Sequence, residues 1–124
     1  TLFQRELGIY SKYFETLGPF IVKCYGFIRN SFMLVFDYMA NGTLNIIREK
    51  KLIDDTINTK VVLRILSSIA FLHSERMIYK DLKPENILFN HDFEPFLTDL
   101  GAISNEENVT SHFGNPLFAA PEFE

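Results

Sequence analysis

The most chemically informative part of the chain runs from Tyr79 to Leu88 and reads Tyr-Lys-Asp-Leu-Lys-Pro-Glu-Asn-Ile-Leu. It places a carboxylate, an ammonium and an amide, those of Asp81, Lys83 and Asn86, on one short loop that contains a proline. Thirteen residues after Asn86 comes Asp99-Leu100-Gly101, just past a short apolar run. This second segment adds another carboxylate and a glycine that permits an unusual backbone turn.

Phosphoryl transfer requires this set of groups. One carboxylate orients the attacking hydroxyl, a second carboxylate and an amide oxygen hold Mg²⁺ on the phosphates, and a cation neutralises charge on the transferring group. The alternative is a turn whose Asp and Asn residues cap helices or satisfy backbone groups, and for an isolated residue that is the better interpretation. Here six consecutive positions, Asp81 to Asn86, are involved, and a fixed hexapeptide arises by chance at roughly one in 10⁷ to 10⁸ per site.

The hexapeptide Asp-Leu-Lys-Pro-Glu-Asn resembles the catalytic loop of protein kinases, and further landmarks of that family follow in the same order over essentially the whole chain. The resemblance implies that Asp81 is the catalytic base. It implies that Lys83, a lysine found in kinases that act on Ser and Thr, contacts the transferring phosphate. Asn86 and Asp99 match the two Mg²⁺ ligands of the family. The implied activity is ATP-dependent phosphorylation of Ser or Thr on protein substrates, with ATP and Mg²⁺ as cofactors.

The same resemblance assigns residues to the nucleotide site. Asp37 and Met39 align with the hinge, where the carbonyl of the first and the amide of the second would bond adenine. Leu88 would pack beneath the adenine ring, and Glu6 would pair with the ATP-binding lysine. Phe36 falls at the position that guards the back of the pocket. For Leu88 and Phe36 taken alone, ordinary core packing is the better interpretation.

The segment after Asp99 matches the activation segment of the family and closes at Ala120-Pro121-Glu122. Three hydroxyl residues within it are candidates for modification: Ser104, Thr110 and Ser111. Ser111 aligns best with the usual regulatory phosphosite.

Four positions depart from the common family pattern. Tyr79 replaces a histidine, an exchange that also occurs in active kinases. Lys80 replaces an arginine, so the charge is kept but the bidentate fork that grips a phosphorylated loop is lost. We therefore do not expect phosphorylation at Ser111 to activate the protein. Leu100 replaces a phenylalanine in an apolar exchange that keeps the metal ligand before it. Asn115 stands where Ser/Thr kinases usually place a threonine.

The first part of the chain predicts a helix followed by a hairpin. Apolar residues recur at helical spacing from Thr1 to Leu17, and Gly18-Pro19 ends that pattern. Two runs of β-branched and aromatic residues, Ile21 to Ile28 and Phe32 to Tyr38, flank the tight turn Arg29-Asn30-Ser31. This arrangement is typical of a β-hairpin.

The rest of the chain predicts two helices and several very short strands. Thr43 can cap a short helix through about Lys50. The acidic run Asp54-Asp55-Thr56 precedes a longer helix that ends near Ser74. Helical spacing predicts the buried face of that helix: Val62, Ile65, Leu66, Ile69 and Leu72. The expected strands that follow are Met77-Ile78, Ile87 to Phe89 and Phe96 to Thr98.

Composition narrows the possible partners. Apolar residues make up 47% of the 124 residues, which is typical of a globular chain. The net charge of −4 argues against nucleic acid or an anionic membrane as a partner. The most apolar window, Ser31 to Ala40, is too short to span a bilayer.

Cys24 is the single cysteine, so no intramolecular disulfide partner exists, and we expect a buried thiol in a cytoplasmic protein. The three histidines show no metal-ligand spacing.

These inferences give an α+β fold, expected to be an incomplete kinase-like domain of two lobes. Residues 1–36 would form a helix and two strands of the small lobe, residues 37–42 the hinge, and residues 43–124 the start of the large lobe through the activation segment. The glycine-rich loop and the ATP-binding lysine of the family would precede Thr1, and no lysine within the sequence fits that role. The alternative is therefore a truncated, non-catalytic kinase-like fragment or pseudokinase interaction module, and we expect the isolated chain to be inactive.

Overall fold

The structure is a computed structural model that describes residues 4, 7, 8 and 19–105. Gln4, Leu7 and Gly8 are helical. The rest of the predicted first helix lies outside the described residues.

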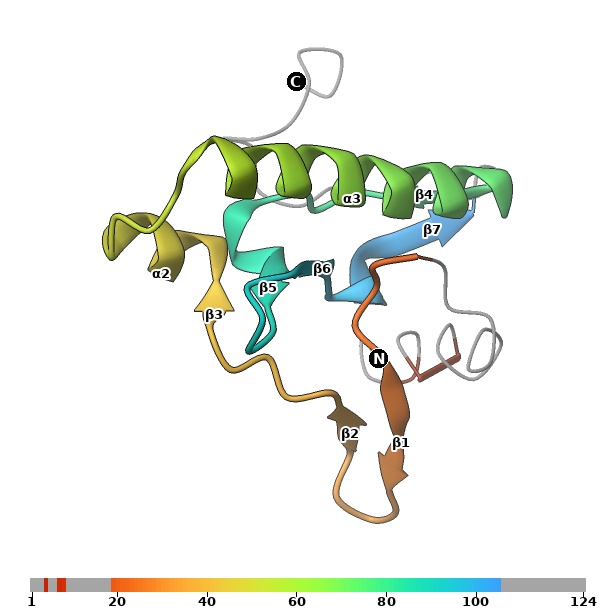
Figure 1. Cartoon of the computed structure of the whole chain (residues 1–124). Helices are drawn as coiled ribbons and strands as arrows, with labels where there is room; N and C mark the ends of the chain where they lie inside the picture. The colour runs from red at the N-terminus through yellow and green to blue at the C-terminus, as the bar shows by residue number, and fades with distance from the viewer. Residues whose placement is uncertain (1–3, 5–6, 9–18, 106–124) are drawn as a thin grey trace.

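Three small sheets and two α-helices make up the described fold (Figure 1). The elements in chain order are β1 (Cys24–Ile28), β2 (Met33–Phe36), β3 (Gly42–Thr43), α2 (Leu44–Glu49), α3 (Asp55–Ser74), β4 (Met77–Tyr79), the 3₁₀ turn η1 (Pro84–Asn86), β5 (Ile87–Phe89), β6 (Pro95–Leu97), the 3₁₀ turn η2 (Leu100–Ala102) and β7 (Ile103–Asn105). The sheets pair as β1-β2, β3-β5-β6 and β4-β7, all antiparallel. The predicted α+β class is confirmed.

The predicted hairpin is confirmed, but its first strand begins later than expected. β1 starts at Cys24, because Ile21 and Val22 pair with β6, while the Lys23 carbonyl accepts from the Asp37 N–H just after β2 at 3.0 Å. Ile21 forms a parallel bridge with Leu97, and the Leu97 N–H donates to the Phe20 carbonyl at 2.8 Å. The Val22 N–H donates in turn to the Leu97 carbonyl at 2.9 Å. The entry to the hairpin is thereby joined to the three-stranded sheet.

Both predicted helices form, and their predicted caps are confirmed. The Thr43 hydroxyl accepts from the Ile46 N–H at 3.3 Å at the start of α2. The Asp54 carboxylate accepts from the Ile57 N–H at 2.8 Å at the start of α3. A side-chain oxygen at this position satisfies a backbone donor that the helix itself cannot satisfy.

The predicted buried face of α3 is only partly correct. Ile65 and Leu72 are buried, but Val62 is 56% exposed and Leu66 is 60% exposed. The buried stripe instead includes Ser68, whose hydroxyl donates to the carbonyls of the segment that enters β1. Apolar residues surround this helix on most sides, so spacing alone could not select the face that packs.

The short strands agree closely with expectation, and two more were missed. β5 spans the predicted residues, β4 is one residue longer, and β6 begins and ends one residue earlier than predicted. β3 and β7 were not predicted. Each has two or three residues and pairs with a strand far away in the sequence, β3 with β5 and β7 with β4.

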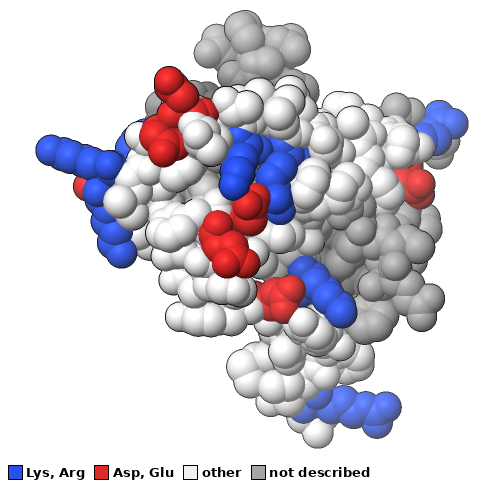
Figure 2. Space-filling model, in the orientation of Figure 1, with Lys and Arg blue, Asp and Glu red and all other residues white. Residues whose placement is uncertain are grey.

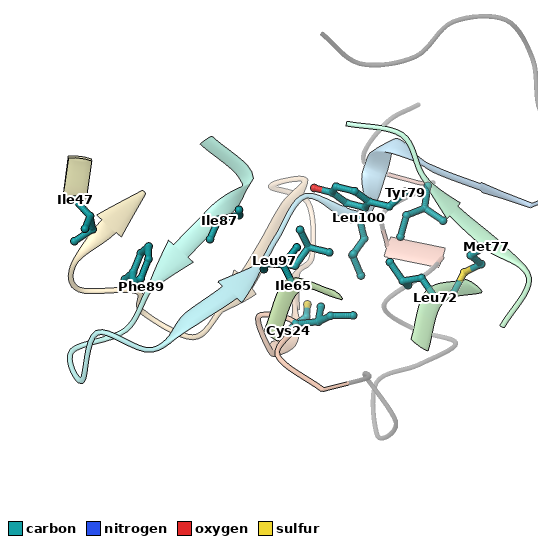
Figure 3. Close-up of a cluster of buried hydrophobic side chains, with 12 residues drawn as sticks. Cys24, Ile47, Ile65, Leu72, Met77, Tyr79, Ile87, Phe89, Leu97 and Leu100 are labelled. Atoms are coloured by element: carbon teal, nitrogen blue, oxygen red, sulfur yellow. The ribbon is translucent and has the colours of Figure 1, made fainter. Parts of the chain in front are cut away.

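One hydrophobic cluster joins these sheets to the helices (Figure 3). Its side chains come from both ends of the described chain, since Cys24 of β1 packs in the same cluster as Tyr79 of β4 and Leu100 of η2. Cys24 is buried, as predicted. Among the described residues, no helix combines the length and the apolar character needed to cross a bilayer.

Candidate active site

The loop between β4 and β5 brings Asp81, Lys83 and Asn86 together. The Lys83 ammonium lies 3.2 Å from the Asp81 carboxylate, and the Asn86 amide nitrogen lies 3.5 Å from the same carboxylate oxygen. The side chains of Asp81 and Lys83 are 13% and 26% exposed, whereas Asn86 is 6% exposed. The three groups that the sequence pattern singled out thus form one contact cluster in which the Asp81 and Lys83 side chains stay partly exposed.

Backbone hydrogen bonds explain why the loop takes this shape. The Asn86 side-chain amide donates to the Asp81 carbonyl at 2.8 Å, which closes the loop across five residues. The Asn86 N–H donates to the Lys83 carbonyl at 3.0 Å. Pro84 occupies the first position of η1, where its missing N–H costs nothing and its fixed φ suits a helical turn.

Asp99 lies at the end of β6, and its preceding residue is tied to the same loop. The Thr98 N–H donates to the Asn86 carbonyl at 3.0 Å, and the Tyr79 hydroxyl donates to the Thr98 carbonyl at 2.6 Å. Asp99 itself has φ 61° and ψ 63°, in the left-handed region. Such a conformation is strained for a residue with a side chain, and it persists only where the neighbours hold it. The residue that follows Asp99, Leu100, is completely buried.

Asn86 and Asp99 offer an amide oxygen and a carboxylate, which are ligand types that Mg²⁺ accepts. The Asn86 amide nitrogen is used by Asp81, which leaves its amide oxygen without a donor among the described residues. The Asp99 carboxylate has no hydrogen bond or ion pair with the described residues. The part of the chain that the structure describes contains no cluster of three or more His, Cys, Asp or Glu side chains suited to a metal. One carboxylate and one amide are what Mg²⁺ uses when substrate phosphates complete its shell.

The segment that joins β2 to β3 carries the predicted hinge residues and is held at both ends. At one end the Tyr25 hydroxyl donates to the Asp37 carboxylate at 2.6 Å, and this bond raises the pKa of Tyr25. At the other end the Asn41 N–H donates to the Phe89 carbonyl at 3.0 Å, and its side-chain amide donates to the Asn90 carbonyl at 2.8 Å.

The groups proposed to bond adenine are unused within this segment. The Asp37 carbonyl and the Met39 N–H have no partner among the described residues. Leu88 is half-buried on β5, where it pairs with Thr43 of β3 and Phe96 of β6.

Sequence reasoning missed the residues that hold the hinge. Tyr25 was predicted only as a strand residue, and Asn41 only as part of the hinge range 37–42. Nothing in their spacing indicates the distant partners. Phe36 packs against the hydrophobic cluster. Several assigned residues lie outside the described residues: Glu6, Thr110, Ser111, Asn115 and Ala120-Pro121-Glu122.

Comparison with known proteins identifies the class. The family model of the protein kinase domain matches residues 1–123. The chain belongs to the protein kinase family, as the catalytic-loop motif predicted.

Individual relatives are named as kinases. The chain is 34% identical to human 3-phosphoinositide-dependent protein kinase 1 over 113 residues, with 84% of this chain and 20% of the relative covered. It is 32% identical over 108 residues to cAMP-dependent protein kinase type 3 of Saccharomyces cerevisiae, with 84% and 27% covered. A probable inactive leucine-rich repeat receptor kinase of Oryza sativa subsp. japonica is 37% identical over 75 residues, with 56% and 6% covered. The chain thus spans about a quarter or less of the length of these relatives.

Proposed function

We propose that this chain supplies the catalytic loop, metal ligands and hinge of a protein serine/threonine kinase that transfers a phosphoryl group from Mg²⁺-bound ATP to protein hydroxyls. The observation that carries the proposal is the contact cluster of Asp81, Lys83 and Asn86, joined through the backbone of Thr98 to Asp99. These are the groups that phosphoryl transfer needs, and they come from two separate segments.

Each side chain has a role that its surroundings support. Asp81 accepts the proton of the attacking hydroxyl, and its side chain keeps 13% exposure for a substrate to reach. Lys83, 3.2 Å from Asp81, stabilises charge on the transferring group. Asn86 and Asp99 hold Mg²⁺, which when bound neutralises charge on the phosphates.

In this proposal the adenine base lies against the hinge, residues 37–42. The Asp37 carbonyl and the Met39 N–H hydrogen-bond adenine. Neither group has a partner among the described residues, so both are available for this role. Leu88 packs beneath the ring, and Glu6 pairs with the lysine that binds the phosphates. The substrate is a Ser or Thr of a protein, and the protein works in the cytoplasm without nucleic acid or membrane as partner.

Two substitutions test the proposal in the protein that carries these residues. Asp81→Asn should lower the rate of phosphoryl transfer by about 10²–10⁴-fold while Mg²⁺·ATP still binds, because only proton transfer is removed. Asp99→Ala should abolish Mg²⁺-dependent ATP binding. Asp92→Asn is the matched control, because that carboxylate is 69% exposed on the β5–β6 turn and should change neither measurement. An Asp81→Asn protein that keeps its rate would remove Asp81 from the base role.

A non-catalytic, kinase-like interaction module is the second candidate. It is favoured by the relative named as a probable inactive kinase, and by the apolar side chains that the β1-β2 hairpin exposes. We expect the 124-residue polypeptide alone to bind Mg²⁺·ATP weakly and to give no measurable phosphoryl transfer. Robust transfer by this polypeptide that Asp81→Asn abolishes would exclude the second candidate.

A further inference from the structure

Side chains of α3 and of neighbouring segments contact the start and the middle of β6, the strand that leads to Asp99. We call this group the Arg64 cluster, and its members are Phe20, Lys60, Arg64, Glu94, Pro95 and Phe96. No part of it belongs to the catalytic loop. Basic and acidic side chains meet on the face that carries α3 in Figure 2.

Arg64 makes directed contacts to the start of β6. Its Nη1 lies 2.6 Å from a Glu94 carboxylate oxygen, and its Nε donates to the Pro95 carbonyl at 3.0 Å. Lys60 contacts the other Glu94 oxygen at 2.7 Å. Hydrogen bonding by Lys60, with the nearby charges of Lys60 and Arg64, lowers the pKa of Glu94, so the carboxylate is ionised at neutral pH. Arg64 therefore holds the backbone and a charged side chain at the point where β6 begins.

The same guanidinium packs between two aromatic rings. It lies 3.9 Å from the centre of the Phe20 ring and 4.8 Å from that of Phe96. Phe96 is the middle residue of β6, and the Phe20 carbonyl accepts from Leu97 at the end of that strand. The Arg64 side chain is only 17% exposed, which strengthens both the ion pair and the cation–π contacts. Through these contacts Arg64 holds the start and the middle of β6, and the Phe20 ring links it to the segment that pairs with Leu97.

β6 has three residues, and it leads through Thr98 directly into Asp99. Asp99 is in the left-handed conformation, which relaxes unless the flanking backbone is fixed. The β5 ladder fixes one edge of β6, and the Phe20–Val22 segment fixes the other. Arg64 is the side chain that clamps the strand and that second edge together.

We propose that Arg64 is a positioning residue that, by clamping β6 between Glu94 and the Phe20 and Phe96 rings, holds Asp99 in place to share a Mg²⁺ ion with Asn86. This inference rests on the proposed function, because it concerns the metal ligand assigned there. The ligand class is a divalent cation bound to a nucleoside triphosphate.

The test titrates the protein that carries these residues with Mn²⁺·ATP, and records the amide signals of Thr98 and Asp99 by ¹H–¹⁵N NMR. Bound Mn²⁺ broadens the signals of nearby amides. Arg64→Met keeps the length and apolar character of the side chain but removes its charge and hydrogen bonds. It should raise the Mn²⁺·ATP concentration for half-broadening by about tenfold, the lower end of what loss of an outer-shell partner costs.

Lys60→Met is the matched control. Lys60 touches Glu94 but neither the β6 backbone nor the rings, so the half-broadening concentration should stay within about twofold of wild type. Glu94→Gln should shift it in the same direction as Arg64→Met but by less, since the amide still accepts a hydrogen bond. If Arg64 only stabilised the fold, Arg64→Met would lower the unfolding midpoint and leave the half-broadening concentration of the folded protein unchanged.

The outcomes separate the two proposals. Half-broadening at the wild-type concentration in folded Arg64→Met overturns the positioning role and leaves the proposed function standing. Absence of broadening at Thr98 and Asp99 in wild type overturns the metal site and the positioning role together. Should Arg64→Met fail to fold, Arg64→Lys decides, because it keeps the ion pair and loses the Pro95 bond and the guanidinium stacking. An unchanged half-broadening concentration in Arg64→Lys would then reject the role.

Discussion

The catalytic-loop region, β4 to β7, and the β1-β2 hairpin differ in how far their side chains are buried. In the catalytic-loop region the apolar residues Phe89, Leu97 and Leu100 are completely buried, and the polar residue Asn86 is nearly so. In the hairpin Phe27 and Met33, among others, are about half exposed.

This difference teaches which part of the site is formed by the chain's own contacts. The catalytic loop is closed by its own hydrogen bonds and lies above a packed core, so Asp81, Lys83 and Asn86 are positioned locally. The hairpin is a two-stranded sheet, and such a sheet is marginal unless something packs on it. The hinge next to it is held by a few hydrogen bonds that solvent can reach.

The comparison is most directly tested by truncating one phenylalanine in each region. Phe89→Ala should destabilise the fold by about 3–5 kcal/mol, because it leaves a cavity in the core. Phe27→Ala removes a ring that is 49% exposed and should cost about 1 kcal/mol. Urea unfolding followed by circular dichroism measures both. Equal losses would show that the hairpin is packed as tightly as the catalytic-loop region.

A smaller effect is expected from the polar contacts of the catalytic loop. Asn86→Leu should destabilise the metal-free protein by about 1–3 kcal/mol, because the partly buried Asp81 carbonyl loses its donor. Asn45→Leu removes a bond of 2.7 Å to Glu85 at an exposed place, and should stay within about 0.5 kcal/mol. Unfolding midpoints of the two variants provide the measurement. A neutral Asn86→Leu would mean that solvent reaches the loop and satisfies the carbonyl.

The smallest effect concerns the bond between the hairpin and the hinge. Tyr25 donates to Asp37, which raises the pKa of Tyr25 above 10.0. A raised pKa in the folded state means that the contribution to stability is complete below about pH 10, the unfolded value, and is lost as pH rises through the folded value.

Two measurements check this bond. The ultraviolet absorbance of tyrosinate should show a titration above the ordinary range that disappears in Tyr25→Phe. The unfolding midpoint at neutral pH should fall only slightly in that variant, because the bond is at the surface. A normal titration of Tyr25 would show that the hinge is not held from this side.

Much of the local structure could be predicted because its causes are local. Thr43 and Asp54 cap helices through donors three residues away, and Ile87 to Phe89 forms a strand between loop residues. The catalytic loop was found because its six residues are consecutive. The roles assigned to those residues remain predictions, for which the contact cluster is the structural support.

Other features could not be predicted, because they depend on partners far away in the sequence. β3 and β7 exist only through their pairing with β5 and β4. The packing face of α3 was misassigned in part, since Arg64 and Ser68 are drawn inward by distant carbonyls. Ser68 lies three residues after Ile65 and four before Leu72, so spacing allows it on the buried face, and only the polar side chains of Arg64 and Ser68 kept them out of the prediction.

The sequence by itself determined the protein kinase family, the helix caps and the groups available for phosphoryl transfer, because each is written in consecutive or regularly spaced residues. Only the tertiary structure decided that Thr98 joins Asp99 to the catalytic loop, which face of α3 packs, and that Arg64 holds β6. These contacts join residues at least 12 positions apart, and their free energy appears only when the chain has brought the partners together.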